Sequence, residues 1–154
     1  MTNAFDLGIK TVFIVRKNSM GSSYNYIRRS SGIDDVFWNM TGGAIRVIRN
    51  GVTSSWDRPA GQGYNNLWRL FKEQYDGTHT GHTLTVNNVL ETLTSVATGN
   101  PGTSTTTSTL SIGSDDGSYV ISGDIAEFMI YNRILTSQEQ SKITSYLNKK
   151  WMVY

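Results

Sequence analysis

A strand that runs directly into a capped helix closes this chain, and it constrains the fold more than any other feature. Residues 125–131 form an apolar, β-prone run, and Asn132-Arg133 follows as a turn. Thr136 can then act as a helix N-cap, and Glu139, three residues later, can complete a capping box. We therefore expect a strand, a tight turn and a helix in this order.

The expected helix is amphipathic. Ile143, Leu147 and Trp151 recur every four residues and so fall on one stripe of the helix. Lys149 and Lys150 lie in the last turn, where the helix dipole favours cations. An amphipathic helix that follows many strands is expected to cover part of a sheet or to close one end of a sandwich.

The rest of the chain has the composition of a β protein. Its 154 residues include 15 Gly and 2 Pro, with 38% hydrophobic and 17% charged residues, which suits exposed polar strand faces in one domain. Strands are predicted at residues 11–16, 24–29, 36–38, 44–49, 66–74, 83–86, 89–93, 110–113, 119–121 and 125–131. The first of these is expected to be buried on both faces, because it is an unbroken apolar run.

Two hairpins are expected from their turn residues. Asn50-Gly51 predicts a type I′ turn, because both residues tolerate positive φ, and Asn87-Asn88 predicts a second tight turn. Residues 95–109 are rich in Gly, Ser and Thr, so we expect a long loop or a ragged edge there.

Bulk properties exclude several classes of function. A net charge of +2 is too small to indicate a nucleic-acid partner, and the absence of cysteine excludes disulfides and Cys-based zinc sites. The sequence has no stretch near the roughly 18 apolar residues of a membrane span, so no membrane insertion is expected. The first six residues lack the features of a signal peptide, so we expect synthesis in a cytoplasm.

The order of several motifs carries a family resemblance. The motifs are the closing segment from residue 123, the Tyr75–Thr78 turn, the hairpin at 84–90, Leu110–Ser114 and the strand at 11–16. Together they resemble the concanavalin A-like lectin/glucanase superfamily, in its laminin-G-like jelly-roll branch. The resemblance implies an all-β, two-sheet antiparallel jelly-roll sandwich with one short C-terminal α-helix. Residues 1–154 would form one such domain, complete or as a piece of a larger chain.

Glycoside-cleaving relatives in this superfamily place several carboxylates along one strand, because the reaction needs two carboxyls across the scissile bond. The sequence has no Glu-x-Asp-x-x-Glu pattern. Asp124 and Glu127 are three apart and would face opposite sides of a strand, so we interpret them as scaffold residues. No enzymatic activity is expected.

Two sets of residues were weighed as metal sites. Asp115 and Asp116 could hold calcium through their oxygens, as laminin-G-like domains often do at a loop rim, although paired acids also form solvated turns. Asp34-Asp35 carries the same two alternatives. His79 and His82 lack further zinc ligands at suitable spacing, so we expect them to be exposed loop residues.

Aromatic residues beside polar ones are the best indication of a ligand site, because sugar rings stack on Trp and Tyr while their hydroxyls need polar partners. Two clusters have this composition, and their residues are Trp56, Asp57, Arg58, Tyr64, Asn65, Tyr24, Tyr26 and Arg28. Packing contacts or subunit contacts are the equal alternative for these aromatic residues. Trp38, Trp68 and Trp151 are expected to be core residues instead.

The favoured interpretation is a non-enzymatic module that binds a glycan or a host-surface receptor. Family distribution and composition suggest a phage virion or bacterial surface adhesion domain. One alternative is a structural decoration or assembly module that binds neighbouring virion subunits or copies of itself. A polysaccharide-cleaving enzyme is disfavoured. No cofactor is expected apart from the calcium considered above.

Overall fold

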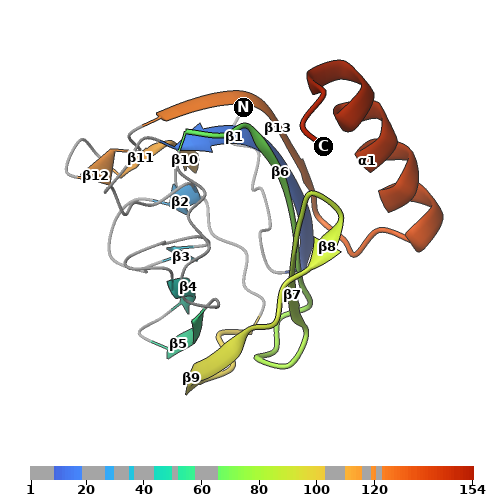
Figure 1. Ribbon diagram of the computed structural model, residues 1–154. Coiled ribbons are helices and arrows are strands. Elements are labelled where there is room, and N and C mark those ends of the chain that lie inside the picture. The colour runs from blue at the N-terminus through green and yellow to red at the C-terminus, as the bar shows by residue number, and fades with distance from the viewer. Residues whose placement is uncertain are drawn as a thin grey trace, which may run out of the picture.

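The computed structural model describes residues 9–18, 27–29, 35–36, 44–49, 52–57, 66–102, 110–115, 119–120 and 123–154. Two sheets lie face to face in Figure 1, and helix α1 (Ser137–Trp151) lies against the outer face of one of them. Every described strand pairing is antiparallel. The predicted all-β, two-sheet antiparallel sandwich with a C-terminal helix is therefore confirmed. No helix within the described ranges is long and apolar enough to cross a membrane.

The first sheet has five strands in the order β13-β1-β6-β7-β8. Their bounds are β1 (Lys10–Asn18), β6 (Arg69–Tyr75), β7 (His82–Val86), β8 (Val89–Leu90) and β13 (Gly123–Tyr131). β1 lies between β13 and β6, so both of its edges are paired, and residues 11–16 are all buried as predicted. The strand predicted at 66–74 is confirmed as β6, which begins three residues later and ends at Tyr75.

The second sheet has six strands in the order β10-β2-β3-β4-β5-β9. Their bounds are β2 (Ile27–Arg29), β3 (Asp35–Val36), β4 (Ala44–Arg49), β5 (Val52–Asp57), β9 (Thr94–Thr98) and β10 (Leu110–Ile112). A small third sheet pairs β11 (Ser114–Asp115) with β12 (Tyr119–Val120). β4 and β5 form the predicted hairpin, although its Asn50-Gly51 turn lies outside the described residues.

β9 decides between the two alternatives for the start of the Gly-, Ser- and Thr-rich segment. Residues 95–98 were expected to be a long loop or a ragged edge, and they form the edge, because β9 pairs irregularly with β5 and ends the second sheet. Thr, Ser and Val favour strands as well as loops, so composition alone did not separate the two. Strand pairing with β5 decided the outcome.

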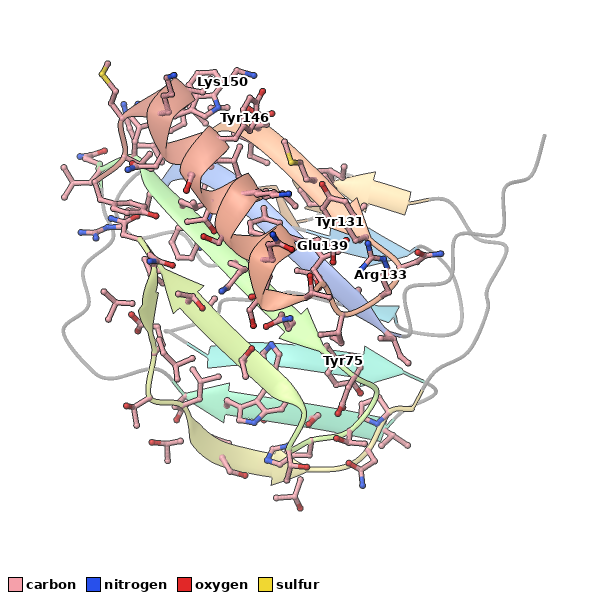
Figure 2. All side chains as sticks on the ribbon, turned by 90° about the vertical axis from the view of Figure 1, so that its right-hand side faces the viewer. Tyr75, Tyr131, Arg133, Glu139, Tyr146 and Lys150 are labelled. Atoms are coloured by element: carbon pink, nitrogen blue, oxygen red, sulfur yellow. The ribbon has the colours of Figure 1, made fainter. Side chains whose placement is uncertain are left out.

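The two faces of the first sheet differ in character. One face packs against α1 through Phe13, Val15 and Leu70, which form a buried cluster with Leu135 and Leu147. Burial of this cluster holds the helix on the sheet, as the amphipathic pattern predicted. Figure 2 shows α1 lying along this face.

The opposite face of the first sheet points into the space between the sheets and is partly polar. Glu73 and Leu84 are directly opposed across β6 and β7, and so are Tyr75 and His82. Directly opposed residues share a face, so Glu73 and His82 lie side by side between the sheets. Both are buried, and a buried charged group needs a partner there.

The capped helix start is confirmed. The Thr136 hydroxyl accepts a hydrogen bond from the Glu139 backbone N–H, and the Glu139 carboxylate accepts one from the Thr136 N–H. Arg133 donates two hydrogen bonds to the same carboxylate, of 2.9 and 2.6 Å (Figure 2). The Thr11 hydroxyl accepts from the Leu135 N–H and donates to the Arg133 carbonyl, which ties the helix start to β1.

Asn87 and Asn88 form the predicted tight turn, with φ values of 48° and 65°. The Asn87 side chain also accepts a hydrogen bond of 2.9 Å from the Leu70 N–H. Two tryptophans correct the predicted core, because Trp68 is 39% and Trp151 is 36% exposed. Trp38 lies outside the described residues. Trp68 precedes β6 and Trp151 ends α1, and residues at element ends are less enclosed.

Candidate functional site

A hollow of about 460 Å³ opens at the edge of the sandwich, beside the strands that end the two sheets. Residues of both sheets and of the β6–β7 loop line it: Trp56, His79, Thr80, His82, Thr83, Leu90, Glu91, Leu93 and Ser95. The chain leaves β8 in the first sheet and enters β9 in the second within a few residues, and that crossing brings the lining together (Figure 1).

Stacked rings form the central part of this lining. The indole of Trp56 and the imidazole of His79 lie parallel, with centroids 4.7 Å apart and planes 10° apart. The imidazole of His82 lies 4.1 Å from the Trp56 ring at 45°. Trp56 is 4% exposed, so the three rings form one packed unit that presents a limited surface to the hollow.

His79 is held in one orientation by hydroxyl groups from two strands. Its Nδ1 lies 2.5 Å from Ser54 Oγ on β5, and its Nε2 lies 2.7 Å from Ser95 Oγ on β9. A hydroxyl can donate or accept, so this arrangement suits either tautomer of the ring. The His79 backbone N–H also donates to the side chain of Asn100, at 2.7 Å. The protein's own hydrogen bonds therefore fix the orientation of the ring.

The loop that carries His79 is stabilised by a local turn. Asp76 Oδ1 accepts from the backbone N–H and from the hydroxyl of Thr78, at 2.9 and 2.7 Å. This is an Asx turn, which fixes the chain after β6. Gly81 faces the same carboxylate, and a Cβ there would lie 1.8 Å from Asp76 Oδ1, so the close approach requires glycine.

A buried hydrogen-bonded pair of side chains lies behind the stack. His82 Nε2 and Glu73 Oε1 are hydrogen-bonded, and neither side chain is exposed. Among the described residues, Glu73 Oε2 and His82 Nδ1 have no hydrogen-bond partner. The predicted exposed loop position of His82 is therefore wrong. His82 begins β7, where pairing with Tyr75 turns its ring inward.

The outer part of the hollow combines apolar and hydroxyl groups. Leu90 and Leu93 supply apolar surface, while Thr80, Thr83 and Ser95 supply hydroxyls. Glu91 adds a carboxylate, which accepts hydrogen bonds when ionised. Such a lining can stack against the C–H face of a sugar ring and bond to its hydroxyls.

Of the residues predicted as ligand contacts, the structure describes three, which are Trp56, Asp57 and Arg28. Trp56 lines the hollow, and Asp57 is exposed at the end of β5. Arg28 lies in β2, and Asp115 of the expected calcium pair lies in β11. The remaining predicted positions lie outside the described residues: Tyr24, Tyr26, Arg58, Tyr64, Asn65 and Asp116. Within the described ranges, no group of three or more His, Asp or Glu side chains could hold a metal ion.

The sequence analysis did not single out Glu73. It interpreted His79 as an exposed loop residue and not as part of the lining of a hollow. One signal for Glu73 was available, because Phe71, Glu73 and Tyr75 alternate along and just beyond the strand predicted at 66–74. A carboxylate between two aromatic residues on one strand face is expected to be buried and paired. No signal in the sequence predicted that His79 would meet Ser95, since His79 lies in the β6–β7 loop and Ser95 lies in β9 of the other sheet.

Comparisons with known proteins bear on the fold. No family model matches the chain, and no curated protein sequence is similar to it. Among solved structures, the chain is similar to domain 4 of AbnA, a GH43 extracellular arabinanase from Geobacillus stearothermophilus, in complex with arabinotriose. The TM-score is 0.50 at 14% identity, over 93% of this chain and 69% of that one. This similarity supports the predicted fold coarsely, and the laminin-G-like branch stays a prediction.

Proposed function

We propose that this chain is a non-enzymatic carbohydrate-binding module and that the hollow beside Trp56 is its glycan site. The observation that carries the proposal is the fixed Trp56–His79 stack, which opens into a hollow with both apolar and hydroxyl groups. Sugar recognition needs that combination, because a sugar has an apolar C–H face and a polar edge. The ring is held before any ligand arrives, so little ordering entropy is lost on binding.

The structural neighbour supports the same class of ligand. Domain 4 of AbnA was solved in complex with arabinotriose, and it has a similar fold. Fold alone does not determine function, so the neighbour suggests the first ligands to test and not the site. Arabino-oligosaccharides and a broad glycan array are the appropriate first probes, each with and without calcium.

Two adjacent residues of β8 provide a matched test. Leu90 and Val89 are 67% and 65% exposed, and only Leu90 lines the hollow. Leu90→Ser should weaken glycan binding about fivefold, since removing that apolar contact costs about 1 kcal/mol. Val89→Ser should leave binding unchanged. Equal affinity of both variants and the parent for every bound glycan would contradict the assignment of the site.

A finer proposal concerns where the module acts. We infer an adhesion domain on a virion or a bacterial surface, which would bind host-surface glycans or a receptor. Its support is the family resemblance and the composition of the sequence. Binding of the purified domain to intact host cells, competed by the glycan that occupies the hollow, tests this proposal. Cell binding that this glycan does not compete would contradict it.

A second candidate function is assembly with neighbouring subunits. β8 and β9 end their sheets, and Val89, Leu90 and Val96 on these strands are exposed. An unpaired strand edge with apolar side chains is a surface on which another chain can pair. Light scattering after gel filtration distinguishes the two candidates, because a stable oligomer that Val96→Lys dissociates would favour assembly.

A further inference from the structure

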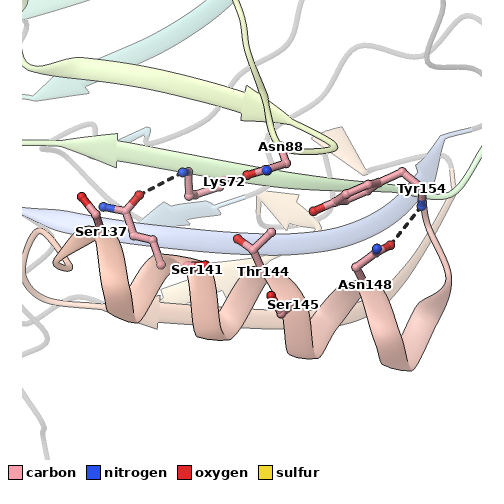
Figure 3. A pocket seen from close by; sticks show the side chains of 9 residues that line it. Lys72, Asn88, Ser137, Ser141, Thr144, Ser145, Asn148 and Tyr154 are labelled. Carbon is pink, nitrogen blue, oxygen red and sulfur yellow. Dashed lines mark hydrogen bonds between the residues drawn. The ribbon is translucent and has the colours of Figure 1, made fainter.

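A second hollow lies on the other side of the first sheet, between α1 and the β6–β8 region (Figure 3). Its volume is about 460 Å³, within the range of small-molecule sites. Its lining residues are Lys72, Asn88, Ser137, Gln140, Ser141, Thr144, Ser145, Asn148 and Tyr154. We call it the helix groove. It shares no lining residue with the hollow beside Trp56.

The groove is lined by hydrogen-bonding groups along its whole length. Hydroxyl and amide side chains of α1 follow one another at helical spacing on this side of the helix, as Figure 3 shows. Ser and Thr are moderate helix formers, so helix stability does not explain this concentration. Asn148 accepts from the Tyr154 N–H at 3.0 Å through its oxygen, which leaves its amide N–H groups for another acceptor.

Among the described side chains that line the groove, Lys72 supplies the only charge. Its amine donates to Gln140 Oε1 at 2.9 Å, and no ion pair joins it to a carboxylate of the described residues. Partial burial lowers the pKa of Lys72, because desolvation disfavours the charged amine. A bound anion would restore the electrostatic stabilisation that the amine has lost from water.

Hydrogen bonds fix the side chain of Gln140 beside Lys72, and the start of α1 nearby favours an anion. Gln140 donates through Nε2 to the Leu135 carbonyl at 2.7 Å, which directs its oxygen toward the amine. Ser137 begins α1, so the positive end of the helix dipole lies at this end of the groove. The acidic group of the first turn, Glu139, is bonded to Arg133 and Thr136.

We propose that the helix groove binds a sugar acid, with the carboxylate at Lys72 and the ring hydroxyls on the Ser, Thr and Asn side chains of α1. One cation beside many neutral donors and acceptors suits a singly charged, polyhydroxylated ligand. A phosphate group favours several cations or backbone N–H groups instead. The groove would give the module a preference for glycans that contain uronic acids, independently of the hollow beside Trp56.

Titration with oligogalacturonate, followed by calorimetry and amide NMR, tests the proposal. A neutral galacto-oligosaccharide of equal length is the matched ligand, and acetate and inorganic phosphate are the simple anions. We expect oligogalacturonate to shift the amides of Ser141, Thr144 and Asn148, and to bind at least tenfold more tightly than the other three. Equal binding of the neutral sugar, or acetate and phosphate binding as tightly as oligogalacturonate, would overturn the proposal.

Variants of two lysines complete the test. Lys72→Met keeps the aliphatic stem but removes the charge, and it should weaken oligogalacturonate binding at least tenfold. Lys142→Met removes an exposed charge from the same helix, outside the groove lining, and should leave binding unchanged. Ser141→Ala, at an exposed position, should weaken binding about threefold without unfolding the protein. Retained affinity in both Lys72→Met and Ser141→Ala would overturn the proposal, whatever Leu90→Ser does at the other site.

Discussion

The indole N–H of Trp151 donates a hydrogen bond of 2.6 Å to Glu127 Oε2 and so joins the end of α1 to β13. Lys150 lies 2.9 Å from the same oxygen, and Figure 2 shows Lys150 and Tyr146 together at this end of the helix. The opposite end is held through Arg133 and Glu139. The helix is therefore held at both ends, and between them Leu147 packs in the buried cluster with Phe13, Val15 and Leu70.

The hydrogen bond from Trp151 lowers the pKa of Glu127, and Lys150 and Tyr146 act in the same direction. A carboxyl with a lowered pKa stabilises the fold above its ordinary pKa, and this contribution is lost as the pH falls through the lowered value. Glu127→Gln should therefore lower Tm at pH 7 and reduce the loss of Tm between pH 5 and pH 2. Thermal unfolding across this range tests the prediction.

Asp124→Asn is the control, because Asp124 is exposed and lies 3.9 Å from Lys17. It should change the pH dependence less than Glu127→Gln does. Glu127→Gln should also leave glycan binding intact, since Glu127 lines neither hollow. Loss of glycan binding in a folded Glu127→Gln variant would contradict the scaffold role.

The helix start should be equally sensitive to its acidic residue. The hydrogen bonds from Arg133, and then those from Thr136, lower the pKa of Glu139 to about 2. The stabilisation from Glu139 is therefore complete above the ordinary carboxyl pKa and falls away only toward pH 2. Glu139→Gln keeps a capping side chain but loses the ion pair, whereas Glu139→Ala loses both, so Tm should fall further in Glu139→Ala.

Thr136→Ala isolates the other half of this cap and should cost about 1 kcal/mol in the free energy of unfolding. Thermal unfolding gives the Tm of the three variants, and denaturant unfolding gives their free energies of unfolding. An unchanged midpoint in Glu139→Ala would show that the capping box adds nothing to stability.

Local features of the fold could be predicted from the sequence, because their causes lie within a few residues. The Thr136–Glu139 cap and the Asn87-Asn88 turn are such cases, and the apolar run at 11–16 needed only its own composition to indicate a buried strand. β9 could not be predicted, because its residues become a strand only by pairing with β5, about forty positions earlier.

The candidate site depends on the register in which the strands pair, and this register could not be predicted from the sequence. Trp56 was predicted as a ligand residue from its polar neighbours in sequence, and it lines the hollow from within β5. His82 reaches Glu73 because β6 and β7 pair with Tyr75 opposite His82, and a shift by one residue would turn His82 outward. His79 meets Ser95 only when the two sheets face each other.

The Asn87-Asn88 turn gives a test of backbone conformation. Asn88 has a φ of 65°, a conformation that Gly adopts without strain because it has no Cβ, and that Asn tolerates better than most other residues. Asn88→Ala should lower the free energy of unfolding by about 1 kcal/mol, and Asn88→Gly should change it by less than half as much. Denaturant unfolding measures both, and equal losses would mean that φ does not limit this position.

The buried pair of Glu73 and His82 should be costly to break and tolerant of joint replacement. Glu73→Leu leaves the buried His82 without its partner and should cost about 3 kcal/mol in the free energy of unfolding. Glu73→Leu combined with His82→Phe removes both polar groups, so the double variant should regain most of the lost free energy of unfolding.

Gln74→Leu, on the opposite face of β6, is the matched control and should cost little free energy of unfolding. Denaturant unfolding measures these free energies, and the fluorescence of the four tryptophans includes that of Trp56, on which His82 packs. A double variant as unstable as the sum of the single variants would show that the two residues do not act as a pair.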